Sequence, residues 1–246
     1  MYPFAYAPPK KYYLRSGAYL SEPGHPVADT FFRVNSCYTN NLMQFSIADL
    51  LIVIPVIIFS MGLHEAMHAL TAHKLGDTTA SDLGRITLNP LKHIDIVTTV
   101  ALPVMLIIAG LPPIFAAKPV PFNPARVKFD EFGAALVGVA GPLTNLAIAI
   151  AVAVAYRLLQ PTGLFANVLL VTIIINCSFF VFNMLPIPPL DGSRLLYAVA
   201  PEPLQDVMAA IERAGFLVLL AVLFVLLPVI GPLVNNGVNL LVNFLL

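Results

Sequence analysis

The sequence predicts an all-α polytopic membrane protein, with about four to five transmembrane helices, a re-entrant segment and short strands near the functional site. Three observations support this fold class. Of the 246 residues, 59% are hydrophobic and 11% are charged, whereas soluble domains contain about 25% charged residues. Mean hydropathy is +0.86. Several nearly uncharged runs exceed the roughly 20 apolar residues that a helix needs to cross a bilayer.

The chain divides into a polar beginning and one membrane domain. Residues 1–42 are rich in Tyr and Pro, and we expect them to form a flexible N-terminal extension. Residues 43–246 are predicted to form a single domain. Its four spanning runs are residues 47–72, 132–157, 164–190 and 214–246. The second of these runs is rich in Gly and Ala, which let helices approach closely, so we expect it to be central in the bundle.

The remaining segments are less regular. Residues 96–117 are as apolar as the spanning runs, but Pro103, Gly110, Pro112 and Pro113 interrupt them. In the polar stretch before them, the Thr-rich residues 78–89 favour short strands and turns. Prolines in residues 118–131 predict an extended conformation there.

Residues 60–70, SMGLHEAMHAL, place two histidines and a glutamate within the first predicted span. His64 and His68 are four residues apart, so they lie on one face of a helix and can bind the same Zn²⁺ ion. Zinc lowers the pKa of a bound water to about 7, and Glu65 can take the proton as general base. Histidines that satisfy buried hydrogen bonds are the alternative interpretation. Glu65 favours the metal, because a carboxylate without a partner in an apolar helix is strongly destabilising.

A catalytic zinc ion needs a third protein ligand and an open position. His73 follows His64 by nine residues, about half a turn around the helix, so its geometry does not fit. Asp191 ends a long uncharged run in FNMLPIPPLDGSRLL, where three prolines break the helix. Broken helices at membrane depth are tolerated where they line a water-filled cavity. We therefore predict that His64, His68 and Asp191 bind one zinc ion per chain.

Three motifs in the same order resemble the site-2 protease family of intramembrane zinc metalloproteases. HExxH is present as residues 64–68, GPLTN at 141–145 matches the small-residue helix motif of that family, and residues 183–192 match its second motif. GRITLNPLKHID and AKPVPFNP resemble the compact subgroup that lacks PDZ and CBS domains. Together these matches cover most of residues 47–215.

The resemblance implies a zinc endopeptidase of a prokaryotic (inner) cell membrane that cleaves peptide bonds within or beside a substrate's transmembrane helix. The three ligands named above would hold zinc, and Glu65 would activate water. Asn145 and Asn183 would face the site and steady the substrate carbonyl or its oxyanion. Interhelical hydrogen bonding is an equally weighted alternative for both amides. His93 and Asp95 match the subgroup pattern without an assigned chemical role.

A shared zinc ion also constrains the topology. The histidines and Asp191 lie toward the C-terminal ends of the runs 47–72 and 164–190, which must therefore be on one side of the bilayer. One intervening run must enter and leave on the same face, and the interrupted run 96–117 is the candidate. The positive-inside rule then makes the zinc-proximal side cytoplasmic. The basic residues on that side would be Lys74, Arg85, Lys92, Lys118, Arg126, Lys128, Arg194 and Arg213. Arg157 would lie on the opposite side with the four basic residues of the N-terminal extension, so the split is eight to one without the extension, and eight to five, which decides little, with it.

The alternative function is a membrane zinc-binding scaffold or a metal transporter without proteolysis. Transporters usually show internal repeats and polar residues in several spans, which this sequence lacks, and Glu65 argues against an inactive scaffold. The expected partners are a transmembrane protein substrate and the lipid bilayer. A formal net charge of zero, with no basic block, argues against nucleic acid.

Overall fold

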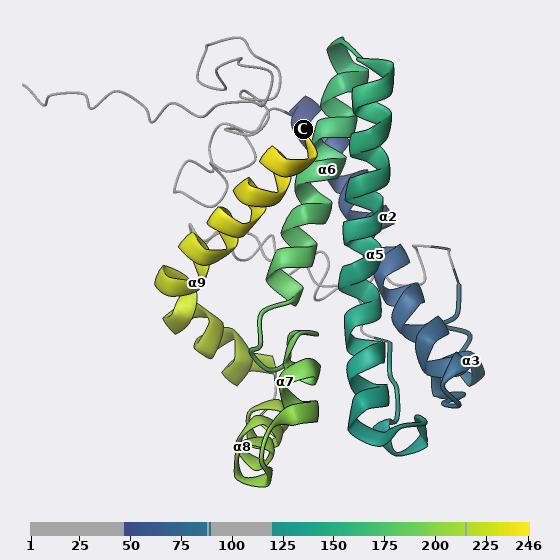
Figure 1. Cartoon of the computed structure of the whole chain (residues 1–246), viewed down its shortest axis with the longest axis vertical. Coiled ribbons are helices and arrows are strands. Elements are labelled where there is room, and N and C mark those ends of the chain that lie inside the picture. The colour runs from purple at the N-terminus through teal and green to yellow at the C-terminus, as the bar shows by residue number, and fades with distance from the viewer. Residues whose placement is uncertain (1–46, 88, 90–119, 215) are drawn as a thin grey trace, which may run out of the picture.

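The computed structural model describes residues 47–87, 89, 120–214 and 216–246, and this part of the chain is helical (Figure 1). The predicted extension at 1–42 and the predicted re-entrant run 96–117 lie outside these residues. The helical elements are α2 (Ile47–Lys74), α3 (Thr79–Asp82), η4 (Pro124–Arg126), α5 (Asp130–Leu159), α6 (Gly163–Asn183), α7 (Ser193–Val199), α8 (Glu202–Arg213) and α9 (Phe216–Leu245).

Three of the described helices, α2, α5 and α6, are long and apolar enough to cross a membrane. They coincide with three of the four predicted runs, although α6 ends at Asn183 rather than at residue 190. Proline-containing turns follow, because a helix cannot continue through the prolines of residues 184–190. The fourth run corresponds to α9, which has no charged residue and contains Pro228 and Pro232. Figure 1 shows that α9 bends, as prolines inside a helix cause.

The long helices run in alternating directions. α2 and α6 start at the same end of the bundle and run in the same direction, and α5, which contacts both, runs in the opposite direction (Figure 1). The C-terminal ends of α2 and α6 therefore both point toward the end of the bundle where α5 starts, and α3, α7 and α8 lie in that half of the bundle. A hydrogen bond of 2.8 Å from the Lys128 N–H to the Leu75 carbonyl joins the end of α2 to the segment before α5. This arrangement places the C-terminal ends of the two ligand-bearing runs on one side, as a shared zinc ion requires.

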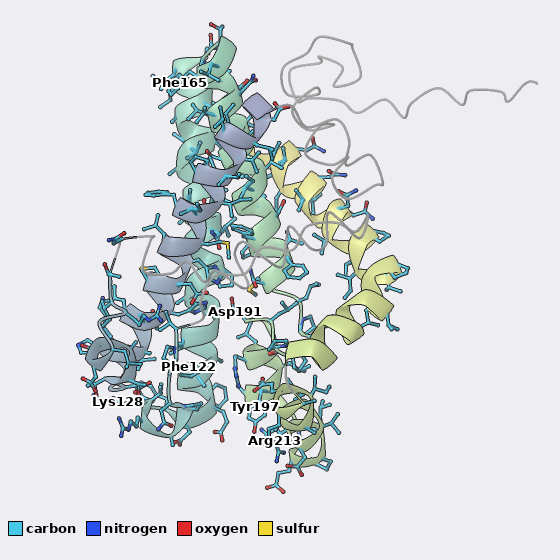
Figure 2. The ribbon with its side chains drawn as sticks, turned by 180° about the vertical axis from the view of Figure 1, so that it is seen from behind. Phe122, Lys128, Phe165, Asp191, Tyr197 and Arg213 are labelled. Atoms are coloured by element: carbon cyan, nitrogen blue, oxygen red, sulfur yellow. The ribbon has the colours of Figure 1, made fainter. Side chains whose placement is uncertain are left out.

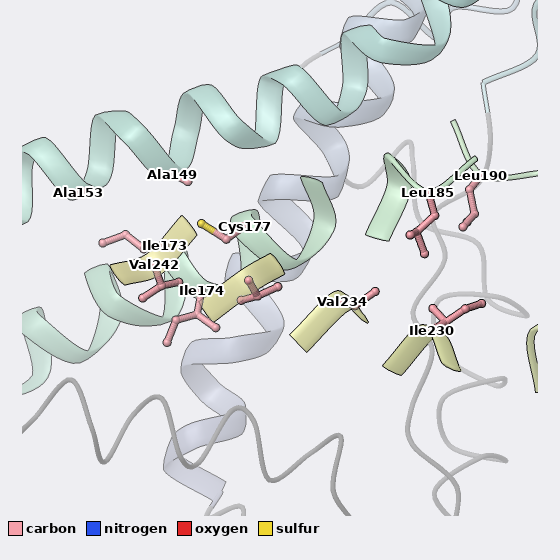
Figure 3. Close-up of a cluster of buried hydrophobic side chains, with 11 residues drawn as sticks. Ala149, Ala153, Ile173, Ile174, Cys177, Leu185, Leu190, Ile230, Val234 and Val242 are labelled. Atoms are coloured by element: carbon pink, nitrogen blue, oxygen red, sulfur yellow. The ribbon is translucent and has the colours of Figure 1, made fainter. Parts of the chain in front are cut away.

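The core forms around α5, which contacts α2, α6, α7 and α9. Its small residues Ala149 and Ala153 are buried against Ile173 and Cys177 of α6 and against apolar residues of α9 (Figure 3). Small side chains bring the helix backbones close together, and the interior gains dispersion contacts from that proximity. The central position predicted for this helix is confirmed. Cys177 is a buried free thiol.

The strands predicted in residues 78–89 are not present in the part of this stretch that the structure describes. Thr79–Asp82 forms the short helix α3 instead. Asp77 explains the difference, because its carboxylate accepts hydrogen bonds from the backbone N–H and the hydroxyl of Thr79. Such local side-chain bonds start a helical turn and override the preference of threonine for strands.

Candidate metal centre

His64 and His68 lie one turn apart on α2 and direct their ring nitrogens to the same point. Their Nε2 atoms are 3.0 Å apart, and the rings are nearly perpendicular at 81°. Both side chains are almost completely buried, with exposed fractions of 10% and 11%. The helical period alone produces this arrangement, because residues four apart share a face.

Asp191 reaches the same point from the turns that follow α6. Its Oδ2 atom lies 3.0 Å from the Nε2 of His64 and 3.4 Å from the Nε2 of His68. These turns are closed by a hydrogen bond of 2.6 Å from the Gly192 N–H to the Asn183 carbonyl. A Cβ atom at Gly192 would collide with the backbone of Met184 and Leu185, so the tight closure needs glycine.

With neutral rings protonated on Nδ1, the three converging atoms are all acceptors, and such a group could hold a metal ion. The Nδ1 atom of His68 lies 2.7 Å from the Val137 carbonyl, which can only accept, so this Nδ1 carries the proton. The Nδ1 atom of His64 lies 2.6 Å from Oδ1 of Asn145. Both Nε2 atoms of the neutral rings are then free to coordinate a metal, beside an Asp191 oxygen. A metal cation bound between them would offset the repulsion among these three buried lone pairs.

The spacing of the donors also fits zinc. Zn–N bonds of about 2.0–2.1 Å in tetrahedral geometry place neighbouring ligand atoms about 3.3 Å apart. The three separations here are 3.0, 3.0 and 3.4 Å. The separations of the His64, His68 and Asp191 donor atoms thus match three corners of a zinc tetrahedron, and three protein ligands would leave the fourth position for water or substrate, as in catalytic zinc sites.

α5 approaches the metal centre most closely at Gly141. A Cβ atom built at this residue would overlap the Nε2 of His68 and would lie 2.6 Å from the Nε2 of His64. One turn earlier, a Cβ atom at Gly138 would lie 2.9 Å from the Asp191 carbonyl oxygen and from the Cβ of Arg194. Two glycines on one face of α5 therefore make room for the donors and for the turn that carries Asp191.

Glu65 lies between the two histidines in sequence, and an extended segment contacts its carboxylate. The backbone N–H of Val120 donates a hydrogen bond of 3.0 Å to Oε2 of Glu65. Farther along the same segment, the Asn123 N–H donates to the Asp77 carboxylate at 2.6 Å. Between them, the guanidinium of Arg194 lies 5.8 Å from the centre of the Phe122 ring. The carboxylates of Glu65 in α2 and of Asp77 in the turn after α2 thus hold residues 120–123 beside α2.

The buried Asp77 carboxylate is stabilised in its ionised form. Burial by itself would raise the pKa of Asp77, but hydrogen bonds from Thr79 and from the Asn123 N–H outweigh that effect. The positive charge of Arg126 acts in the same direction. The pKa of Asp77 is therefore held below its ordinary value.

Asn145 and Asn183 make different contacts. Asn145 is fully buried and bridges helices, because its Oδ1 faces His64 and its Nδ2 donates to Oδ1 of Asn176 at 2.9 Å. This is the interhelical bonding considered as an alternative. The side-chain amide of Asn183 donates to the Phe179 carbonyl of its own helix. His73 is exposed at the end of α2, and His93 and Asp95 lie outside the described residues.

Sequence reasoning missed Asn176 and Ser60, which are buried and hydrogen-bonded to each other. The available signal was a polar residue inside an apolar helix, VTIIINCSFF, which is costly unless it has a partner. The contact of Val120 with Glu65 was also missed. It uses a backbone N–H, which leaves no mark in the sequence.

Comparison with known proteins identifies the family. The model of Peptidase family M50 matches residues 160–226. YwhC of Bacillus subtilis strain 168 is 34% identical over 192 residues, which cover 74% of this chain and 84% of YwhC. Rip2 of Mycolicibacterium smegmatis is 30% identical over 70% of this chain and 66% of its own length. Rip2 of Mycobacterium tuberculosis strain H37Rv is 32% identical over 72% of this chain and 66% of its own length.

YwhC and both Rip2 proteins are named "Putative zinc metalloprotease". No solved structure matches the chain. The match to YwhC extends over most of both chains, and the matched family model includes the turn that carries Asp191. Together with the three converging donors, these matches show that the chain belongs to peptidase family M50 and is a zinc metalloprotease.

Proposed function

We propose that this metalloprotease works inside the membrane, where it hydrolyses peptide bonds in or beside the transmembrane helices of substrate proteins. The observation that carries this proposal is the place of the donors, between α2 and the end of α6, beside α5. Within the described part of the chain, these three helices are long and apolar enough to span. In Figure 2, Asp191 lies well inside the length of the bundle, whereas Lys128 and Arg213 lie near one end. A substrate bond must enter the bilayer to reach it.

The three donors would hold zinc, which would supply a Lewis acid that lowers the pKa of water to about 7. We assign Glu65 as the general base. The Val120 N–H engages Oε2 of Glu65, so Oε1 is the oxygen that would take the proton from the attacking water. The same carboxyl group would then return a proton to the leaving amine. The Asp191 side chain is 23% exposed, against 10% and 11% for the histidines, and it marks the side from which water would enter.

Asn145 and Asn183 receive different roles in this proposal. Both ends of the Asn145 amide are engaged by buried partners, so we assign it to positioning His64 rather than to contact with substrate. Asn183 is half-buried, and its carbonyl is bonded to Gly192, next to Asp191. Its amide is our candidate for a hydrogen bond to the substrate carbonyl or oxyanion.

We further propose that the metal centre is nearer the cytoplasmic face of a prokaryotic cell membrane. Arg157, at the C-terminal end of α5, lies at the opposite end of the bundle. Under the positive-inside rule, the more basic end is cytoplasmic. Lys74 ends α2 and Arg126 ends η4, just before α5 begins, and Lys128 and Arg213 lie near this same end in Figure 2.

A cleavage assay with the purified full chain in detergent tests the proposal. Wild-type protein should cut a model substrate with one transmembrane helix, and a chelator should stop the reaction. Glu65→Gln should keep about one zinc ion per chain but slow cleavage by about 10²–10⁴, the usual contribution of a general base. Cleavage by Glu65→Gln at the wild-type rate would refute the assigned base. A protein that cuts only soluble unfolded chains would refute the intramembrane substrate.

The same assay tests the domain boundary. We propose that residues 43–246 form a single protease domain, so a chain that begins at Met43 should insert and cleave like the full chain. Loss of activity on this truncation would show that the first 42 residues contribute to the enzyme.

A further inference from the structure

The helices around the metal centre contain a chain of buried polar side chains that the zinc ligands alone do not explain. Ser60 of α2, Asn145 of α5 and Asn176 of α6 have exposed fractions of 0–1%. They connect in series, from Ser60 to Asn176, from Asn176 to Asn145, and from Asn145 to His64. Polar groups in apolar helices are costly to bury, so a chain of this length needs a reason.

In this series of hydrogen bonds, the contacts of Asn176 determine which group donates and which accepts in each bond. The amide nitrogen of Asn176 lies 2.8 Å from the Thr172 carbonyl oxygen, which cannot donate a hydrogen bond. If Asn176 were turned around, two oxygens would face each other in a buried site. Nδ2 of Asn176 therefore points to Thr172 and to the Ser60 hydroxyl oxygen at 2.9 Å, and its Oδ1 points to Asn145.

The orientation of Asn145 follows from that of Asn176. Because Oδ1 of Asn176 can only accept, Asn145 must present Nδ2 to it, at 2.9 Å. Oδ1 of Asn145 is then left for His64, at 2.6 Å from Nδ1. An oxygen there requires the proton to be on Nδ1, which leaves Nε2 of His64 with the lone pair that a metal needs.

A comparison with His68 shows why the tautomer of His64 depends on the orientation of Asn145. The Nδ1 of His68 faces the Val137 carbonyl, a backbone group that can only accept. The Nδ1 of His64 faces an amide, which donates from one end and accepts at the other. Without a constraint, Asn145 could turn its NH₂ group to His64 and favour the tautomer whose Nε2 is protonated and cannot bind metal.

We propose that Asn176 is a positioning residue, which fixes the metal-binding tautomer of His64 by orienting the amide of Asn145. This inference adds a residue to the proposed protease, and it concerns zinc binding rather than proteolysis. A failure of the proposed function would leave zinc affinity intact, so the two can be distinguished. Partners of metal-binding histidines typically contribute about 10–100-fold in metal affinity.

The experiment measures zinc affinity of the purified full chain by competition with a chromophoric chelator. Asn176→Leu keeps the size of the side chain and removes the relay, and it should weaken zinc binding about 10–100-fold. Thr172→Val is the matched control on the same helix. It removes a hydroxyl that donates to the Val168 carbonyl of its own helix, and it keeps the Thr172 carbonyl, so its zinc affinity should equal that of the wild type.

A second substitution separates tautomer control from packing. Asn145→Asp accepts a hydrogen bond with either oxygen, so it no longer needs Asn176 to orient it. In the Asn176→Leu background, Asn145→Asp should restore zinc affinity. With Asn176 present, it should lower the affinity, because a carboxylate oxygen would face Oδ1 of Asn176.

Three results would overturn the proposal. The first is wild-type zinc affinity in Asn176→Leu. The second is a loss of zinc affinity in Asn176→Leu that Asn145→Asp does not restore. The third is a loss of zinc affinity in Thr172→Val as large as that in Asn176→Leu. Should Asn176→Leu fail to fold, the nearly isosteric Asn145→Asp decides alone. A lower zinc affinity than wild type supports the relay, and an equal or higher affinity overturns it.

Discussion

Gly141→Ala is the sharpest test of where the metal binds. The added Cβ atom would overlap Nε2 of His68 and lie 2.6 Å from Nε2 and 2.7 Å from Cδ2 of His64. Non-bonded carbon and nitrogen atoms are comfortable at about 3.5 Å, so α5 and α2 would have to separate by about 1 Å. Metal–ligand distances tolerate only about 0.2 Å. Since the methyl group lies between the two donors, we expect zinc affinity to fall by more than about 100-fold.

The same substitution should leave the fold in place. Overpacking a core typically costs about 1–3 kcal/mol, whereas replacing glycine by alanine inside a helix stabilises by about 1 kcal/mol. The net cost of Gly141→Ala is then at most about 2 kcal/mol, against a total stability of about 5–15 kcal/mol. Metal loss and unfolding are therefore separable at this position.

Metal analysis and thermal unfolding of the purified protein, measured side by side, check this prediction. Gly231→Ala in α9 is the control, because a Cβ atom there meets nothing within 4 Å while the gain in helix propensity is the same. Gly231→Ala should keep about one zinc ion per chain, and Gly141→Ala should keep none. Zinc bound by Gly141→Ala with wild-type affinity would show that the metal does not bind between His64 and His68.

Three further outcomes are expected. Asp191→Ala should lose zinc on metal analysis while His73→Ala keeps it, and the opposite pattern would show that the third ligand is wrong. Cysteines at the exposed positions Leu83 and Arg126 should react with an impermeant thiol reagent from the cytoplasmic side only, and labelling from opposite sides would refute the topology. Because the pKa of Asp77 is lowered in the folded chain, its ionised form stabilises the fold above the ordinary aspartate pKa of about 4. That stabilisation should be lost as pH falls through the lowered pKa, and Asp77→Asn should unfold at lower temperature at neutral pH with a weaker acid dependence. Identical thermal unfolding curves across pH for Asp77→Asn and wild type would contradict this linkage.

The sequence predicted those parts of the site that depend on local geometry. His64 and His68 follow from the helical period, and Asp191 follows from a charge placed where prolines end an apolar helix. A strand was expected at Thr79–Asp82, and this segment forms α3 instead, because hydrogen bonds from Thr79 to Asp77 favour a helical turn there. The contact of Glu65 with the Val120 backbone could not be predicted, because any residue except proline offers the same N–H group.

The two histidines show how one motif can depend on two kinds of support. His68 is oriented by the backbone carbonyl of Val137. Any substitution of the Val137 side chain preserves this carbonyl, provided that the helix is kept. His64 depends on Asn145, and through it on side chains of two other helices. Single substitutions in the relay should therefore weaken zinc binding in steps through His64, whereas a substitution that moves α5, such as Gly141→Ala, affects both donors at once. HExxH specifies the spacing of two ligands, but the protonation state of one of them is determined by a residue of α6 that is more than 100 positions away in sequence.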